Sequence, residues 1–156
     1  MKKIFKKVFI IGLIIFLLMQ FYRPARNITF GQDVTADFIK VYNVPKNIAV
    51  ILRTSCYDCH SNNTNYPWYS NIQPVGLFME NHINEGKEDL NFNEYGNYSK
   101  RRQNSKLEAI SKEIKQNEMP LASYTLIHKN AILSNAQKQE VLTWIKKAKD
   151  SLSSKY

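Results

Sequence analysis

The clearest chemistry in the sequence lies in one short run, Cys56-Tyr57-Asp58-Cys59-His60. These are the only two cysteines of the chain, and C-x-x-C-H spacing is the signature of covalent haem attachment. Two thiols about one helical turn apart can add to the two vinyl groups on one edge of a porphyrin, and the adjacent histidine is placed to bind the iron. We therefore predict one haem c per chain, attached through Cys56 and Cys59 and ligated by His60.

Three other interpretations of the cysteine pair remain open. A structural zinc site needs four ligands, so the other ligands would have to come from His60, His82 and His128. A thioredoxin-like redox pair belongs between a strand and a helix, whereas this sequence shows no alternation of strands and helices. A simple disulfide is the third alternative. Haem attachment is favoured because the motif, its helical context and the N-terminal segment agree with it.

The second axial ligand of such a haem must come from elsewhere in the chain. Met119 is the leading candidate, because it stands before Pro120 in a loop that follows a predicted helix. Thioether sulfur suits low-spin iron and raises its reduction potential. His82 is the alternative ligand, because it shares one face of a predicted helix with apolar residues.

Four helices are expected to position these residues. The first begins at Pro45 and leads into the motif, with Ile48, Ile51, Leu52 and Ser55 at helical spacing. The second carries Val75, Phe78, Met79, His82 and Ile83 on one face, and Gly86 is expected to end it. The third contains Leu107, Ile110 and Ile114 and ends near Gln116-Asn117. The fourth begins with a capping box of Ser134 and Gln137, and its apolar stripe is Val141, Leu142, Ile145, Ala148 and Leu152.

Between the motif and the second helix, turn-forming residues predict an ordered loop over 61–69. Trp68 and Tyr69 in this loop either line the haem or fill the core, and we expect them to fill the core. The Asn-rich connection from Leu90 to Tyr98 shows no clear pattern.

The N-terminal segment has the composition of a membrane anchor. Four lysines, Lys2, Lys3, Lys6 and Lys7, precede an apolar run from Val8 to Met19, and no small-residue cleavage site follows. We predict an uncleaved signal anchor or transmembrane segment over 1–22, a linker over 23–43, a haem-binding domain over 44–150 and a tail over 151–156. This organisation predicts a single-pass protein of the inner (cytoplasmic) membrane whose haem domain faces the periplasm.

The net charge of +9 is spread over the chain. Without the four N-terminal lysines, 18 basic residues face 13 acidic ones, in scattered pairs such as Arg101-Arg102. This pattern favours a solvated surface and redox partner proteins, and we expect no nucleic-acid partner. No phosphate-binding glycine loop or nucleophile motif is present, so we expect an electron carrier rather than an enzyme.

The sequence resembles the bacterial haem-binding domain family from about Val44 to Lys147. The residues that carry the resemblance are Cys56 to Asn62, Tyr66 to Tyr69, Pro74-Val75, His82-Ile83, Glu85-Gly86, Glu118 to Leu121, Tyr124, His128 and Leu142 to Ile145.

The resemblance implies an all-α, cytochrome c-like domain behind an N-terminal anchor, in which the first helix leads into the motif and the last packs against it. It implies that Cys56 and Cys59 attach the haem and that His60 and Met119 ligate it, while His82, Met79 and His128 stay open as distal alternatives. The expected function is extracytoplasmic electron transfer. The alternative is a haem peroxidase or a gas or redox sensor with a displaceable sixth ligand.

Overall fold

The computed structural model describes residues 1–29 and 35–153, and within them it confirms the all-α prediction. Its α-helices are α1 (Lys2–Met19), α2 (Phe38–Val41), α3 (Lys46–Ser55), α4 (Tyr57–His60), α5 (Val75–Asp89), α6 (Lys100–Gln116), α7 (Ala122–Thr125) and α8 (Asn135–Ser153). The described residues also contain the short 3-10 helices η1 (Trp68–Asn71), η2 (Phe92–Asn97) and η3 (Lys129–Ala131), and an isolated β-bridge between Ile28 and Asn63.

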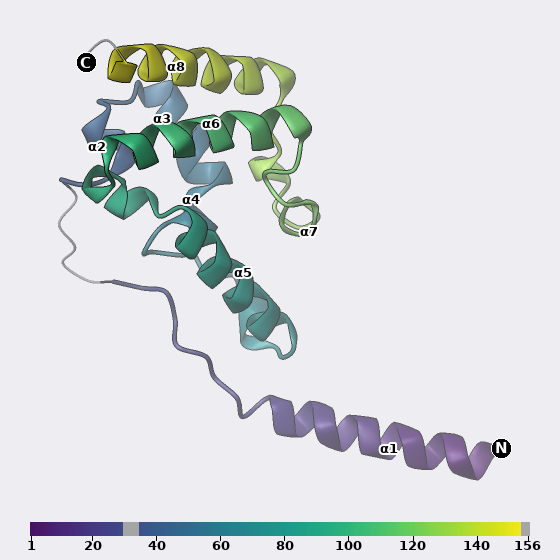
Figure 1. Ribbon diagram of the computed structural model, residues 1–156. Helices are drawn as coiled ribbons and strands as arrows, with labels where there is room; N and C mark the ends of the chain where they lie inside the picture. The colour runs from purple at the N-terminus through teal and green to yellow at the C-terminus, as the bar shows by residue number, and fades with distance from the viewer. Residues whose placement is uncertain (30–34, 154–156) are drawn as a thin grey trace.

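The core of the domain lies where α8 and α6 pack side by side and α3 meets α8 (Figure 1). The predicted stripe of α8 faces this core, and Val141 and Ile145 are almost fully buried. The capping box is also confirmed: Ser134 N–H donates to Gln137 Oε1 at 2.9 Å, and Gln137 N–H donates to Ser134 Oγ at 3.2 Å. The last helix therefore begins and packs as its sequence predicts.

Helix α3 carries the chain into the C-x-x-C-H motif. Its buried residues are the four predicted ones, Ile48, Ile51, Leu52 and Ser55. The helix ends at Ser55, and the motif then forms the single turn α4, in which His60 N–H donates to the Cys56 carbonyl at 3.0 Å. Because α3 packs against both α4 and α8, the motif is attached directly to the core.

An aromatic cluster next to α3 includes a residue from the range predicted as a linker. Phe38 of α2 is 1% exposed and meets Phe92, Tyr95 and Trp144 edge-on, at ring centroid distances of 4.8 to 5.6 Å. Part of residues 23–43 thus contributes to the core, and the position of the domain boundary stays a prediction.

Helix α5 differs from its prediction in where it ends and in which of its side chains are buried. It continues through Gly86 to Asp89, so the predicted end at Gly86 is wrong. Of its predicted apolar face, Ile83 is fully buried, but Val75 and Phe78 are 42% and 56% exposed. Trp68 on η1, which precedes α5, is 77% exposed and does not fill the core.

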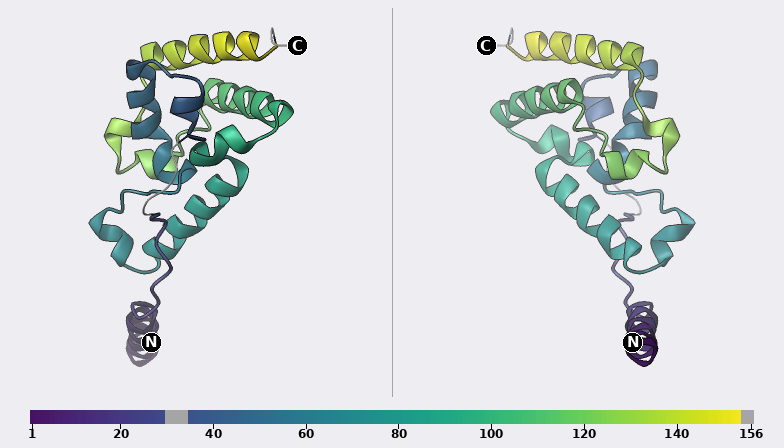
Figure 2. Two further views of the ribbon diagram at one scale, coloured as in Figure 1. Left: turned by 90° about the vertical axis from the view of Figure 1, so that its left-hand side faces the viewer. Right: turned by 90° about the vertical axis from the view of Figure 1, so that its right-hand side faces the viewer.

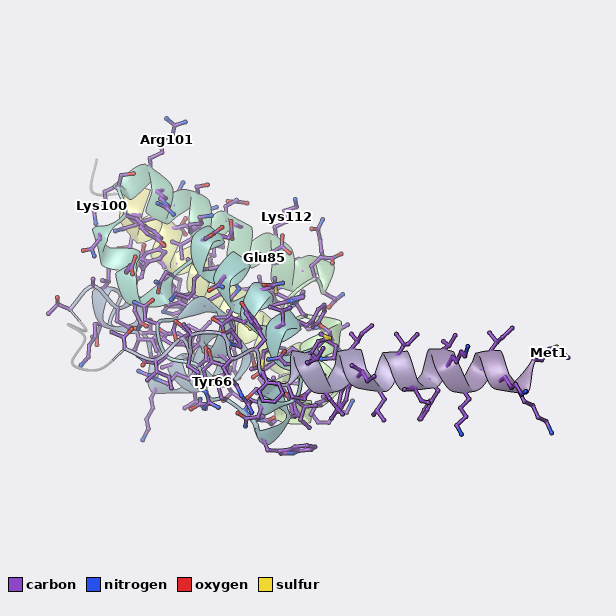
Figure 3. All side chains as sticks on the ribbon, turned by 90° about the horizontal axis from the view of Figure 1, so that it is seen from below. Met1, Tyr66, Glu85, Lys100, Arg101 and Lys112 are labelled. Carbon is purple, nitrogen blue, oxygen red and sulfur yellow. The ribbon has the colours of Figure 1, made fainter. Side chains whose placement is uncertain are left out.

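Helix α1 extends away from the rest of the molecule (Figures 1 and 2). None of its residues is buried, and Figure 3 shows its side chains pointing outward along the whole helix. After α1, Gln20 exchanges two hydrogen bonds with the backbone of Gln73, at 3.0 and 3.1 Å. Arg23 and Arg26 both donate to Asn71. These contacts connect the residues that follow α1 to the end of η1 and to the turn before α5.

The predicted N-terminal transmembrane helix is wrong. Among the helices within residues 1–29 and 35–153, none is both long enough and apolar enough to cross a membrane. Four of the 18 residues of α1 are lysines near its start, and the apolar run from Val8 to Met19 rises only about 18 Å against a hydrocarbon layer of about 30 Å. The predicted single-pass placement in the inner membrane, with the domain facing the periplasm, is overturned by the same finding.

Candidate functional site

One cavity of about 450 Å³ collects the residues that the sequence proposes as haem ligands and attachment sites. Cys56, Cys59, His60, Met119 and His82 all line it. They come from three separate parts of the chain: the α3–α4 junction, α5, and the loop after α6. The volume lies within the range of roughly 300 to 1,000 Å³ that is typical of ligand and cofactor sites. The other lining residues are Ser55, Glu85, Gly86, Asp89, Glu113, Pro120, Leu121 and Tyr124.

The two cysteines are free thiols in the structure. Burial raises the pKa of Cys56 to about 12, with a further contribution from Cys59. Burial and the nearby Asp58 carboxylate raise the pKa of Cys59 to about 11. Redox-active cysteines react as thiolates, so the raised pKa values of both thiols do not favour a thioredoxin-like pair. Within the described residues, no cluster of three or more His, Cys, Asp or Glu side chains could hold a metal ion.

The imidazole of His60 is oriented by two backbone carbonyls. Its Nδ1 lies 2.8 Å from the Gly86 carbonyl oxygen and 3.0 Å from that of Leu90. Carbonyl oxygens only accept hydrogen bonds, so Nδ1 carries a proton, and in the neutral imidazole Nε2 keeps its lone pair. This is the arrangement of metal-binding histidines, in which a hydrogen bond from the other ring nitrogen fixes the tautomer and the ring orientation. Nε2 of His60 is therefore the nitrogen available to iron.

Gly86 allows α5 to approach the motif closely enough to make this contact. A Cβ atom at this position would lie 2.9 Å from the carbonyl oxygen of Cys59, which is too close for any larger residue without displacement. The glycine that the sequence analysis assigned to the end of a helix thus lies inside the helix, where it permits close packing.

The end of α6 determines where Met119 lies. Asn117 has a left-handed backbone conformation with φ of 60°. Asn117 N–H donates to the Ile114 carbonyl and Glu118 N–H donates to the Glu113 carbonyl, which together form a Schellman motif. The predicted helix end near Gln116-Asn117 is confirmed, and the turn brings the next residue, Met119, to the cavity.

Of the alternative distal ligands, His82 is the one that lines the cavity. Its Nδ1 lies 2.9 Å from the Phe78 carbonyl oxygen, so in the neutral imidazole its Nε2 also keeps a lone pair. Met79 and His128 are not among the lining residues. His128 instead forms a hydrogen bond through Nε2 with the Tyr69 hydroxyl group and stacks on Tyr124.

The sequence reasoning did not propose as site residues one residue that lines the cavity, Tyr124, and the residue that it contacts, Asp58. Tyr124 lines the cavity, and its hydroxyl group donates to Asp58 Oδ2 at 2.7 Å. Burial, followed by the hydrogen bond to Asp58, raises the pKa of Tyr124 well above its ordinary value, so Tyr124 is a neutral donor. Asp58 stands between the two cysteines, and both Asp58 and Tyr124 belong to the residues that carry the family resemblance; these are the signals in the sequence that could have marked them.

Comparison with models of protein families gives a match. Residues 14–147 match the model of a family described as a haem-binding domain. No curated protein and no solved structure matches the chain.

Proposed function

Because the chain belongs to the haem-binding domain family, we propose that it is a c-type cytochrome-like electron carrier that holds one haem covalently. In this proposal Cys56 and Cys59 form the thioether bonds, His60 is the proximal ligand, and Met119 is the distal ligand. The partners are redox proteins that donate and accept single electrons.

The observation that carries the proposal is the set of donor atoms around one cavity. Two thiols, an imidazole whose Nε2 is free to bind a metal, and a thioether all line the same space. These groups are the ones that a covalently attached, six-coordinate haem requires. The residues present therefore fit the cofactor that the family membership implies.

In this proposal, separate parts of the chain supply the attachment sites and the two iron ligands. Cys56, which precedes α4, and Cys59 within it present the two thiols, and the carbonyl oxygens of Gly86 and Leu90 orient His60. The Schellman turn at Asn117 precedes Met119, which lines the cavity. The haem, when bound, supplies a one-electron couple between ferrous and ferric iron. If His60 and Met119 both ligated the iron, no coordination position would be left for a substrate, which favours electron transfer over catalysis.

Attachment is tested by producing the full chain together with haem attachment machinery. We expect haem to remain with the protein on a denaturing gel and a pyridine haemochrome spectrum typical of thioether-linked haem. The double variant Cys56→Ala/Cys59→Ala should lose the haem on the gel. Haem that stays bound to this variant under denaturing conditions would show that attachment occurs elsewhere.

The distal ligand is tested by absorption spectroscopy of the ferric protein. A far-red charge-transfer band between sulfur and iron is expected in the wild type and absent from Met119→Ala, whereas the matched variant His82→Ala should keep it. Loss of low-spin iron only in His82→Ala would assign the ligand to His82 instead. A high-spin wild-type spectrum would contradict the electron carrier and favour the peroxidase or sensor alternative.

A further inference from the structure

We propose that the hydrogen bond between Tyr124 and Asp58 is a clasp that holds the segment 117–128 against the haem cavity, so that both are positioning residues for the sixth ligand. We call residues 117–128 the distal segment, because they contain Met119. The inference rests on the proposed function, since it assigns the clasp a role toward the ligand that this segment supplies.

The distal segment has few other attachments to the domain. None of residues 117–128 is buried, and Figure 1 shows α7 below the C-terminal end of α6, outside the packed helices. At its start, the segment is attached to α6 through the Schellman turn and to α8 through Lys138, which donates to Asn117 Oδ1. At its end, His128 contacts Tyr69. The bond from Tyr124 is the attachment between these two ends that reaches the C-x-x-C-H motif.

The acceptor of the clasp is held rigidly. Asp58 Oδ1 accepts hydrogen bonds from the backbone N–H and the side-chain amide of Asn65, at 3.2 and 3.0 Å. The Asp58 carbonyl oxygen accepts one from Thr64 Oγ1 at 2.6 Å. With Oδ1 engaged in this way, Oδ2 is presented to the Tyr124 hydroxyl group at 2.7 Å. A short bond from a hydroxyl group to a carboxylate is stronger than one between neutral groups.

The location of Asp58 gives the clasp its role. Asp58 lies between the two residues proposed to attach the haem, and Tyr124 lies five residues after Met119. The hydrogen bond therefore joins the side of the cavity that carries the cofactor to the segment that carries the distal ligand. Breaking the bond frees the middle of the distal segment, so Met119 leaves the iron more often and an external ligand competes more effectively.

The clasp can be removed without removing the tyrosine ring. The Tyr124 ring stacks on the His128 ring with a centroid distance of 4.2 Å and an interplanar angle of 12°. Phenylalanine keeps this stacking and loses only the hydroxyl group. Tyr66→Phe is the matched control, because Tyr66 also donates to a carboxylate, Glu80 Oε2 at 3.0 Å, but lies outside the distal segment.

The test uses the full-length ferric holoprotein, with imidazole as the competing ligand. We expect Tyr124→Phe to bind imidazole about tenfold more tightly or better, because a hydrogen bond to a charged group is lost. Asp58→Asn, which keeps a neutral acceptor, should give a smaller increase. Tyr66→Phe should match the wild type. Equal imidazole affinities in the wild type and Tyr124→Phe would overturn the proposal.

Hydrogen exchange provides a second readout that does not depend on the iron. The backbone amides of Leu126 and His128, which donate to Ala122 and Tyr124, should exchange faster in Tyr124→Phe than in the wild type or Tyr66→Phe. Unchanged exchange would overturn the clasp, and faster exchange with unchanged imidazole affinity would overturn its role toward the ligand. If the wild type retains no haem on a denaturing gel, the proposed function fails, and exchange in the haem-free protein still decides whether the clasp exists.

Discussion

Replacing Gly86 by alanine tests whether close packing of α5 on the motif positions the proximal histidine. The added Cβ would lie 2.9 Å from the Cys59 carbonyl oxygen, and ordinary contact begins at 3.4 Å. Helix α5 must then move away by about 0.5 Å, which would lengthen the 2.8 Å contact between His60 Nδ1 and the Gly86 carbonyl to about 3.3 Å.

Two opposing effects determine the stability of Gly86→Ala. Overpacking lowers the free energy of unfolding by about 1 to 3 kcal/mol, and alanine in place of glycine inside a helix raises it by about 1 kcal/mol. The free energy of unfolding should therefore fall by about 0 to 2 kcal/mol. The expected change in reduction potential does not depend on this change in stability. A weaker hydrogen bond from His60 Nδ1 makes the imidazole a poorer electron donor to ferric iron, so the reduction potential should rise.

The assays are a redox titration and a urea unfolding curve of the full-length protein. Gly12→Ala is the matched control, because a Cβ at Gly12 of α1 meets no heavy atom within 4 Å. This control should leave the potential and the unfolding midpoint of the domain unchanged. A wild-type potential in Gly86→Ala would refute the argument that Gly86 is needed to position His60.

Three further predictions concern the stability of the domain. Ile145→Ala should lower the free energy of unfolding by about 2 to 5 kcal/mol, because it leaves a cavity at a residue that is 1% exposed; a loss below 1 kcal/mol in urea unfolding would contradict this packing. Ser134→Ala removes the capping box of α8 and should cost about 1 kcal/mol, seen as a lower melting temperature, while an unchanged melting temperature would argue that the cap is not needed. Burial, and then the hydrogen bond with Tyr42, raise the pKa of Tyr95 well above its ordinary value of 10.0. The folded state thus keeps Tyr95 neutral, and the stability that it contributes is present below pH 10 and is lost as the pH rises above it. Urea unfolding midpoints measured on both sides of pH 10 should fall less steeply with rising pH in Tyr95→Phe than in the wild type. An equal fall in both proteins would show that Tyr95 does not cause the loss of stability at high pH.

The features that depend on local periodicity were predictable from the sequence. The buried positions of α3, the capping box of α8 and the end of α6 near Asn117 all follow from side-chain spacing or helix-capping chemistry within one stretch of chain. The candidate site residues were also found this way, since the C-x-x-C-H spacing is local and Met119 follows a helix end.

The features that the sequence reasoning missed depend on tertiary contacts or on a balance of opposing signals. Gly86 was assigned to a helix end because glycine commonly stands there, whereas its role comes from Cys59, which is 27 residues away in the sequence. The bond between Asp58 and Tyr124 joins residues 66 positions apart. In α1 the apolar residues suggested a membrane span, but its lysines outweigh them.

The separation between Asp58 and Tyr124 also bears on the order in which the domain assembles. The contact between His60 and Gly86 closes a loop of 26 residues, whereas the contact between Asp58 and Tyr124 closes a loop of 66 residues. The entropy of loop closure makes the longer connection about 0.8 kcal/mol more costly. The contact that orients His60 is therefore the less costly of the two to close, and we expect it to form before the contact that connects the distal segment to Asp58.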